Sequence, residues 1–181
     1  GAMVSAINML DDIHGGAGEQ AVELYTWIAE AVENGQTLDE AVPDMIDRWQ
    51  YERTRFVPGF GHRFHKPVDP RAPRLLGRVD VAAKVGTVSG NFAVIGRSIQ
   101  EELNTRKGKS VPMNIDGATA VIYAELGFAG PLARGLFCLS RSVGVIAHAW
   151  EQMNQGGRNK GPTPPGYRWT YQGPNPIEKL G

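Results

Sequence analysis

Residues 56–73 read FVPGFGHRFHKPVDPRAP and interrupt a chain that is otherwise patterned for helices. The four prolines and two glycines of this stretch predict a loop, because proline removes backbone donors and glycine permits tight turns. The same loop carries His62 and His65 together with Arg63, Lys66 and Arg71. Ionisable side chains on a loop that is held by rigid helices are typical of a functional site.

On both sides of this loop, apolar residues recur at helical spacing and almost no strand-like alternation is present. Thr37-Leu38-Asp39-Glu40 has the pattern of a capping box, which opens a helix. The chain is therefore predicted to be all-α. We expect helices over about 3–11, 72–86, 89–106, 117–126 and 131–153, with two more between residues 21 and 49.

Two of these helices are apolar nearly all round, at about 3–11 and 117–126. Such helices need partners on several sides, so we expect both to be buried and the protein to be a homodimer. The chain from Gly156 onward is rich in glycine, proline and aromatic residues. We expect this tail to be extended, lying on the surface or wrapped on a partner.

The composition excludes several classes of protein. Nineteen basic and nineteen acidic residues give a formal net charge of zero, so the charge footprint of a nucleic-acid binder is absent. No apolar run reaches the ~20 residues that span a bilayer, and no signal peptide is visible. The single cysteine, Cys138, excludes an intrachain disulfide and is consistent with a reducing compartment. We therefore expect a cytoplasmic protein that binds neither nucleic acid nor membrane.

Three ionisable residues stand within glycine-rich turns. His14 precedes two glycines, His62 follows Gly59-Phe60-Gly61, and Asp116 precedes another glycine. Two histidines and a carboxylate can supply a general base, a neutral donor and an acid, which suits proton abstraction next to a carbonyl. Each also has a structural interpretation: His14 as a helix cap, His62 as a solvated loop residue, and Asp116 as the N-cap of the helix at 117–126.

The sequence predicts no metal site, but it does predict an anion site. The histidines at 14, 62, 65 and 148 show no HxxxH or HExxH spacing, and one cysteine gives no thiolate cluster. Arg141 lies in an apolar helical stretch, where an unpaired charge is costly. We expect Arg141 to be partly buried and paired with a carboxylate of the protein or of a ligand.

Four segments, taken in order, resemble the citrate synthase family. They are His14-Gly15-Gly16-Ala17, Pro58-Gly59-Phe60-Gly61-His62 with Asp69-Pro70-Arg71, Asn114-Ile115-Asp116, and the stretch 140–152. The resemblance implies a citrate-synthase-like fold with a small lobe and an incomplete large lobe, because the upstream part of the family fold is missing. It places large-lobe helices in 1–55, a small CoA-binding lobe in 56–120, and late large-lobe helices and the tail in 121–181.

The resemblance also implies roles for individual residues. His14 would hold the thioester oxygen, Asp116 would move the methyl proton of acetyl-CoA, and His62 would polarise the oxaloacetate carbonyl or the matching citryl hydroxyl. Arg71 and Arg141 would bind substrate carboxylates. The substrate would be a coenzyme A thioester, held by main-chain groups of Val57, Pro58, Gly59, Phe60 and Gly61, by Asn114, and by Lys66 at a phosphate.

Within the family, the sequence is most similar to stand-alone citryl-CoA lyases, to judge from its Gly-Gly-Arg-x-Lys-Gly-Pro ending. Synthases carry an arginine that reaches the neighbouring subunit where this chain has Gly161, and Arg158, Lys160 or Arg168 could substitute for it. Two other hypotheses stay open. One is a citrate or methylcitrate synthase-like condensing enzyme, and the other is a non-catalytic CoA-binding partner subunit.

Overall fold

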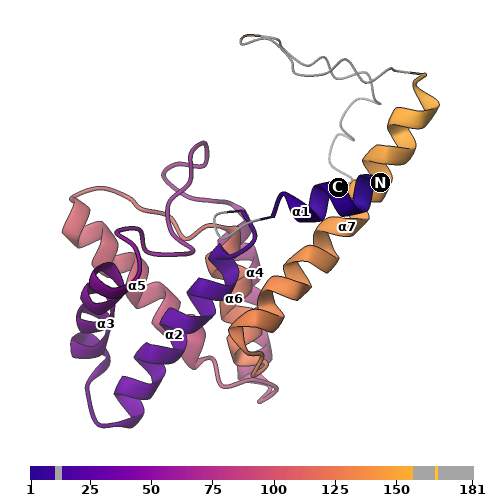
Figure 1. Ribbon diagram of the computed structural model, residues 1–181. Coiled ribbons are helices and arrows are strands. Elements are labelled where there is room, and N and C mark those ends of the chain that lie inside the picture. The colour runs from indigo at the N-terminus through magenta and orange to yellow at the C-terminus, as the bar shows by residue number, and fades with distance from the viewer. Residues whose placement is uncertain (11–13, 157–165, 167–181) are drawn as a thin grey trace, which may run out of the picture.

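The computed structural model describes residues 1–10, 14–156 and 166, and over those residues it contains seven helices and no strand (Figure 1). The helices are α1 (Ala2–Asn8), α2 (Ala17–Glu33), α3 (Leu38–Glu52), α4 (Arg71–Lys84), α5 (Asn91–Lys107), α6 (Ile115–Glu125) and α7 (Gly130–Asn154). The all-α prediction is confirmed. None of the helices in these ranges combines the length and the apolarity needed to cross a bilayer.

Local signals account for several helix ends. The capping box is present at the start of α3, where the Glu40 carboxylate accepts hydrogen bonds from the Thr37 N–H at 3.0 Å and the Thr37 hydroxyl at 2.7 Å. Helix α5 is capped from a distance by Glu125, the last residue of α6. Its carboxylate accepts from the N–H groups of Gly90 at 2.9 Å and Phe92 at 2.8 Å. The positive end of the α5 dipole therefore meets a negative charge.

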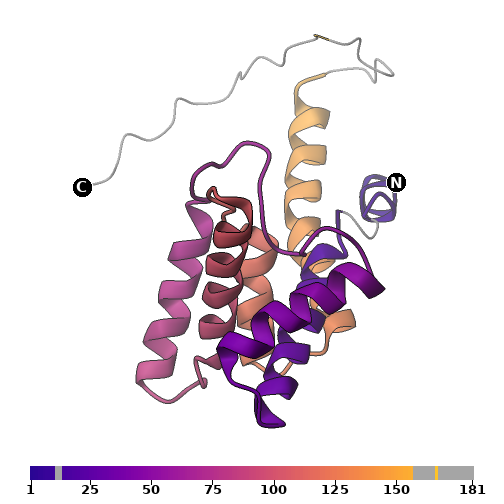
Figure 2. The same ribbon diagram turned by 90° about the vertical axis from the view of Figure 1, so that its left-hand side faces the viewer.

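Helices α2 to α6 pack around one apolar core, with α2 lying against α3, α5, α6 and α7 (Figure 2). The largest side chains that are fully enclosed include Tyr25, Trp49 and Ile99, which come from α2, α3 and α5. This core joins helices from both sides of residue 55. The division into lobes at residues 55 and 120 stays a prediction.

Helices α1 and α7 extend away from this core (Figure 1). Helix α7 is attached through its first turns, and Ala133 is its one buried residue. Helix α1 lies against α7 and has no buried residue. The expectation that the first helix is buried is therefore wrong for a single chain, because α1 packs on a helix that itself leaves the core. The other apolar helix, α6, is covered within the chain, with Ala118, Ala120 and Val121 at 0% exposure.

Candidate active site

The glycine-rich part of the main loop is joined to the segment before α6. Phe60 and Met113 form an antiparallel bridge. The Gly61 N–H donates to the Pro112 carbonyl at 2.7 Å, and the Asn114 N–H donates to the Gly59 carbonyl at 2.9 Å. These bonds bring together two segments that the sequence separates by about fifty residues, and with them the side chains of His62 and Asp116.

Glycine is required at this junction by the closeness of the two backbones. Gly59 has a φ of 84°, and a Cβ placed on it would lie 2.6 Å from the Gly117 Cα. A Cβ on Gly117 would lie 2.3 Å from the Gly59 carbonyl oxygen. No side chain fits at either distance, so the loop can approach the first turn of α6 only because both positions are glycine.

Asn114, and not Asp116, is the N-cap of α6. Its side-chain oxygen accepts hydrogen bonds from the N–H groups of Asp116 at 2.9 Å and Gly117 at 3.2 Å, while its amide nitrogen donates to the Gly61 carbonyl at 2.9 Å. The interpretation of Asp116 as a cap is therefore wrong. Its carboxylate stands in the first turn of the helix and is not used for capping, which leaves it for chemistry.

His62 directs one ring nitrogen to its own loop and the other to the site. Its Nδ1 accepts from the N–H groups of Phe64 at 3.0 Å and His65 at 2.9 Å. A ring nitrogen that accepts carries no proton, so the proton of this imidazole is on Nε2. Nε2 lies 3.5 Å from Nη2 of Arg71, which is also a donor, so the two groups do not bond to each other. Both can donate to an oxygen of a bound ligand.

Arg71 is held in place by Asp69. The Asp69 carboxylate is inaccessible to solvent and accepts from Nε of Arg71 at 2.9 Å, from Nη2 at 2.7 Å and from the Arg71 N–H at 3.1 Å. These bonds outweigh the burial of the carboxylate and lower the pKa of Asp69 to about 2. A guanidinium held by two parallel bonds has a fixed direction, which suits recognition of a carboxylate.

Burial and neighbouring charges have opposite effects on the pKa of Asp116. Burial raises its pKa above the ordinary value, while the charges of Arg71 and Arg141 act in the opposite direction, and the net pKa is raised. A carboxylate with a raised pKa and several cations near it has the character of a general base or acid. The structure therefore brings Asp116 close to His62, Arg71 and Arg141, which are residues to which we assigned catalytic or substrate-binding roles.

A cavity of about 490 Å³ opens beside Asp116. The start of α2 contributes Ala17 and Gln20 to its wall. The rest of the wall includes the predicted CoA-lining residues Val57, Pro58, Gly59, Phe60 and Asn114, together with Thr54, Phe56 and Asp116. A second hollow of about 620 Å³ lies on the other side of the loop, where Val57, Phe60 and Gly61 meet the cationic residues Arg55 and Lys107. Sequence reasoning did not assign Lys107 to the site, because a lysine beside a helix-ending glycine gives no signal.

Three predicted residues need separate comment. His14 is exposed, just before the buried Gly15 and Gly16 that lead into α2. Lys66 is exposed in the loop and lines neither hollow. Their assigned roles remain predictions. The residues Arg158, Lys160, Gly161 and Arg168 lie outside the described part of the chain.

Arg141 differs from expectation. It is exposed, and its guanidinium stacks over the Phe137 ring at 5.0 Å instead of entering an apolar setting. The apolar neighbours from which we inferred burial, Leu139 and Val143, are 66% and 71% exposed. An apolar helical pattern indicates a surface that is to be covered, and residues 1–10 and 14–156 supply no cover at Leu139 and Val143.

The structure also brings His62, His65 and Asp69 close enough to suggest a cation site, with one candidate ligand atom of each within 4.8 Å of the others. The spacing of these residues in the sequence did not indicate this. However, Nδ1 of His62 accepts two N–H groups, and both Asp69 oxygens are bound to Arg71. A divalent ion would have to displace these partners against the charge of Arg71, so the donor set fits an ion pair better than a metal.

The chain matches a known family over most of its length. The family model described as "Citrate synthase, C-terminal domain" matches residues 1–163. The citrate synthase of Acidithiobacillus ferridurans is 30% identical over 78% of this chain, and citrate synthase 2 of Bacillus subtilis is 32% identical over 78%. The structure of citryl-CoA lyase from Hydrogenobacter thermophilus is 28% identical, with a TM-score of 0.70, over 97% of this chain and 64% of that one. This chain spans about a third of the length of those two curated relatives, 35% in each case.

Proposed function

The chain belongs to the citrate synthase family, and we propose that it is a citryl-CoA lyase, which cleaves citryl-CoA to acetyl-CoA and oxaloacetate. The observation that carries the proposal is the grouping of Asp116, His62 and Arg71 beside a cavity. It supplies a proton-transferring carboxylate, a neutral imidazole donor and a fixed guanidinium. A carbon–carbon bond next to a carbonyl is made or broken with the help of these groups.

In the direction of cleavage, the hydroxyl of the citryl group passes its proton to a solvent water and becomes the carbonyl of oxaloacetate as the carbon–carbon bond breaks, and after the reaction Asp116 takes a proton back from solvent. The electron pair of that bond passes to the acetyl-CoA part, which leaves as an enolate. The protonated form of Asp116 then returns a proton to the methyl carbon. The raised pKa of Asp116 supports this role, because it increases the fraction of the acid near neutral pH.

Two groups would stabilise the charges that develop. Nε2–H of His62 would donate to the oxygen that changes from hydroxyl to carbonyl, and its proton is kept on Nε2 by the two N–H groups that Nδ1 accepts. Arg71 would bind a carboxylate of the substrate from the direction that Asp69 fixes. We assign His14 to the thioester oxygen, and Arg141 to a second carboxylate.

The test is to add citryl-CoA and to measure released oxaloacetate with a coupled NADH-dependent dehydrogenase, comparing the chain with Asp116→Asn. Turnover that disappears in the variant supports the lyase. If oxaloacetate and acetyl-CoA are instead condensed while citryl-CoA is not cleaved, the protein is a synthase, which the identity to citrate synthases favours. CoA binding without turnover in either direction would indicate the non-catalytic partner subunit.

We also propose that the protein is a homodimer whose contact includes α7. Apolar residues recur along one stripe of α7 at alternating spacings of four and three, namely Leu132, Leu136, Leu139, Val143, Ile146, Trp150 and Met153. Six of these seven are among the exposed large apolar side chains of the chain. A stripe with this period is suited to packing against another helix.

A further inference from the structure

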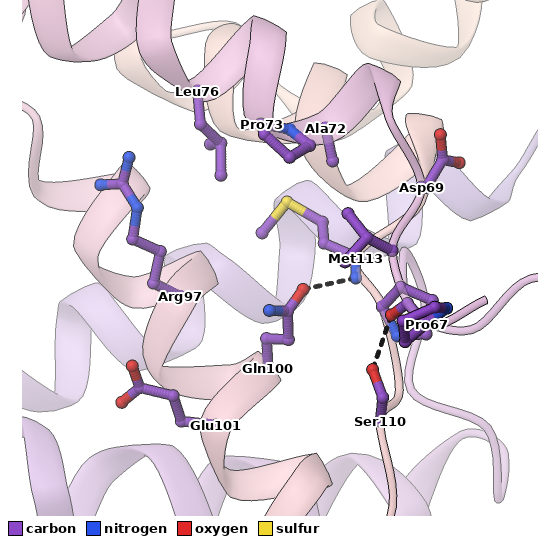
Figure 3. Close-up of a pocket in the computed structure, with 12 residues that line it drawn as sticks. Pro67, Asp69, Ala72, Pro73, Leu76, Arg97, Gln100, Glu101, Ser110 and Met113 are labelled. Carbon is purple, nitrogen blue, oxygen red and sulfur yellow. Dashed lines mark hydrogen bonds between the residues drawn. The ribbon is translucent and has the colours of Figure 1, made fainter. Parts of the chain in front are cut away.

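The short extended segment 111–114 is held from two sides. On one side it bonds to the main loop, through the Pro112 carbonyl and the Asn114 N–H. On the other side it bonds to α5. The Val111 N–H donates to Oδ1 of Asn104 at 2.7 Å, and the Met113 N–H donates to Oε1 of Gln100 at 2.6 Å (Figure 3).

The two amide side chains match the segment that they hold. Gln100 and Asn104 are four residues apart on α5, so they lie one above the other on the same helical face. Val111 and Met113 are two residues apart in an extended chain, so their N–H groups point the same way. Two side-chain oxygens of α5 thus accept the hydrogen bonds that the carbonyl groups of a neighbouring strand would accept in a sheet.

We propose that Gln100 and Asn104 are positioning residues for the reaction, which set the place of Asp116 relative to His62 and Arg71. The inference rests on the proposed function and adds two residues to it that touch no substrate. The segment they hold runs directly into Asn114, which caps α6 and bonds to Gly61, the residue before His62. Movement of this segment would therefore change the distance between the carboxylate of Asp116 and the imidazole of His62.

Gln100 is the stronger of the two links. Met113 is 2% exposed, so its N–H loses its hydrogen-bond partner within the protein if the glutamine oxygen is removed. Gln100 also lines a cavity of about 410 Å³ between α4 and α5, with Leu76 across from it (Figure 3). Room beside the bond lets the segment relax when the bond is lost, instead of being held in place by packing.

The decisive comparison is Gln100→Met against Gln100→Glu. Methionine keeps the length of the side chain and removes the acceptor, while glutamate keeps an oxygen for the Met113 N–H. We expect Gln100→Met to lower kcat on the order of 10- to 100-fold, with KM changed less than about twofold, because misplacing a reacting group by about 1 Å has effects of this size. Gln100→Glu should restore most of kcat.

A second readout does not depend on turnover. Hydrogen exchange at the Met113 amide should accelerate in Gln100→Met and not in Gln100→Glu, and the pKa of Asp116, followed by carboxyl NMR, should move in Gln100→Met. Gln36→Leu is the matched control, because Gln36 bonds to Asp44 at an exposed site far from the segment. The inference is overturned if Gln100→Met leaves the exchange rate of the Met113 amide and the pKa of Asp116 unchanged. If both change but the unmodified chain turns over no substrate, the positioning holds and the proposed function fails.

Discussion

Helices α6 and α7 are both rich in apolar residues, yet their surroundings are opposite. Five of the 11 residues of α6 are buried, namely Gly117, Ala118, Ala120, Val121 and Ala124, whereas only one of the 25 residues of α7 is buried. Asp116 stands at the start of the covered helix, and Arg141 stands on the uncovered one. The difference teaches that the described part of the chain encloses the helix of Asp116 by itself and leaves the second arginine on a helix whose apolar stripe is exposed.

The largest effect expected from the covered helix is on turnover. Asp116→Asn should lower kcat for citryl-CoA cleavage by roughly 10³–10⁴-fold, because loss of a general acid or base has effects up to this size. Its pKa is raised in the folded state, so the charged form disfavours folding at pH values above that pKa. The same variant should therefore unfold at a higher temperature than the parent at pH 7. Calorimetry and the coupled assay measure the two effects, and an active variant would remove Asp116 from the mechanism.

Two glycine substitutions test the two helices directly. Gly117→Ala should destabilise the chain by about 3 kcal/mol or more, because the new Cβ would meet the Gly59 carbonyl oxygen at 2.3 Å. Gly144→Ala in α7 meets nothing within 4 Å and should stabilise an isolated chain by up to about 1 kcal/mol through helix propensity. Urea unfolding gives both values. If Gly144→Ala is destabilising, a partner lies on that face of α7.

Acid should weaken the ion pair between Asp69 and Arg71. The pKa of Asp69 is about 2 in the fold, against about 3.9 in an unfolded chain. Because the folded value is depressed, its contribution of about 2 kcal/mol is present above pH 4 and is lost as the pH falls from about 4 to 2. Asp69→Asn should remove this part of the pH dependence. If the Asp69–Arg71 pair contributes nothing to the free energy of unfolding, unfolding curves of the parent chain and of Asp69→Asn would not differ between pH 2 and pH 7.

The smallest effect on the stability of the single chain is expected on the outer face of α7. Ile146 is 59% exposed, so Ile146→Glu should change the free energy of unfolding of the monomer by no more than about 0.5 kcal/mol. If α7 is a dimer contact, the same change should convert dimer to monomer at micromolar concentration in sedimentation. Val121→Glu in α6 is the contrasting variant and should prevent folding. A parent chain that already sediments as a monomer would contradict the proposed dimer.

Much of this architecture could be predicted from local sequence signals. The capping box at Thr37 and Glu40 and the glycine after Lys107 indicate helix ends through contacts within a few residues, and the structure has helix ends there. The loop that carries His62 was recognisable because prolines and glycines exclude helix. Each of these features depends on backbone geometry that neighbouring residues determine alone.

The features that sequence reasoning missed depend on residues far apart in the chain. Nothing in an isolated asparagine or glutamine of α5 indicates that it accepts a hydrogen bond from residues 111 or 113. Asn114 and Asp116 are both good capping residues, and the hydrogen bonds that Oδ1 of Asn114 accepts from the N–H groups of Asp116 and Gly117 show which one is used. The burial expected for Arg141 failed because a hydrophobic pattern specifies a face to be covered and does not specify whether the same chain covers it.

The long-range cap on α5 has a mechanical consequence. Glu125 joins the end of α6 to the start of α5, while Gln100 and Asn104 join α5 to the segment that leads back into α6. These links close a ring, so neither helix can detach without breaking bonds at both of its connections. The ring is expected to open as a single cooperative unit with Asp116 inside it, whereas the outer turns of α7 can fray one after another.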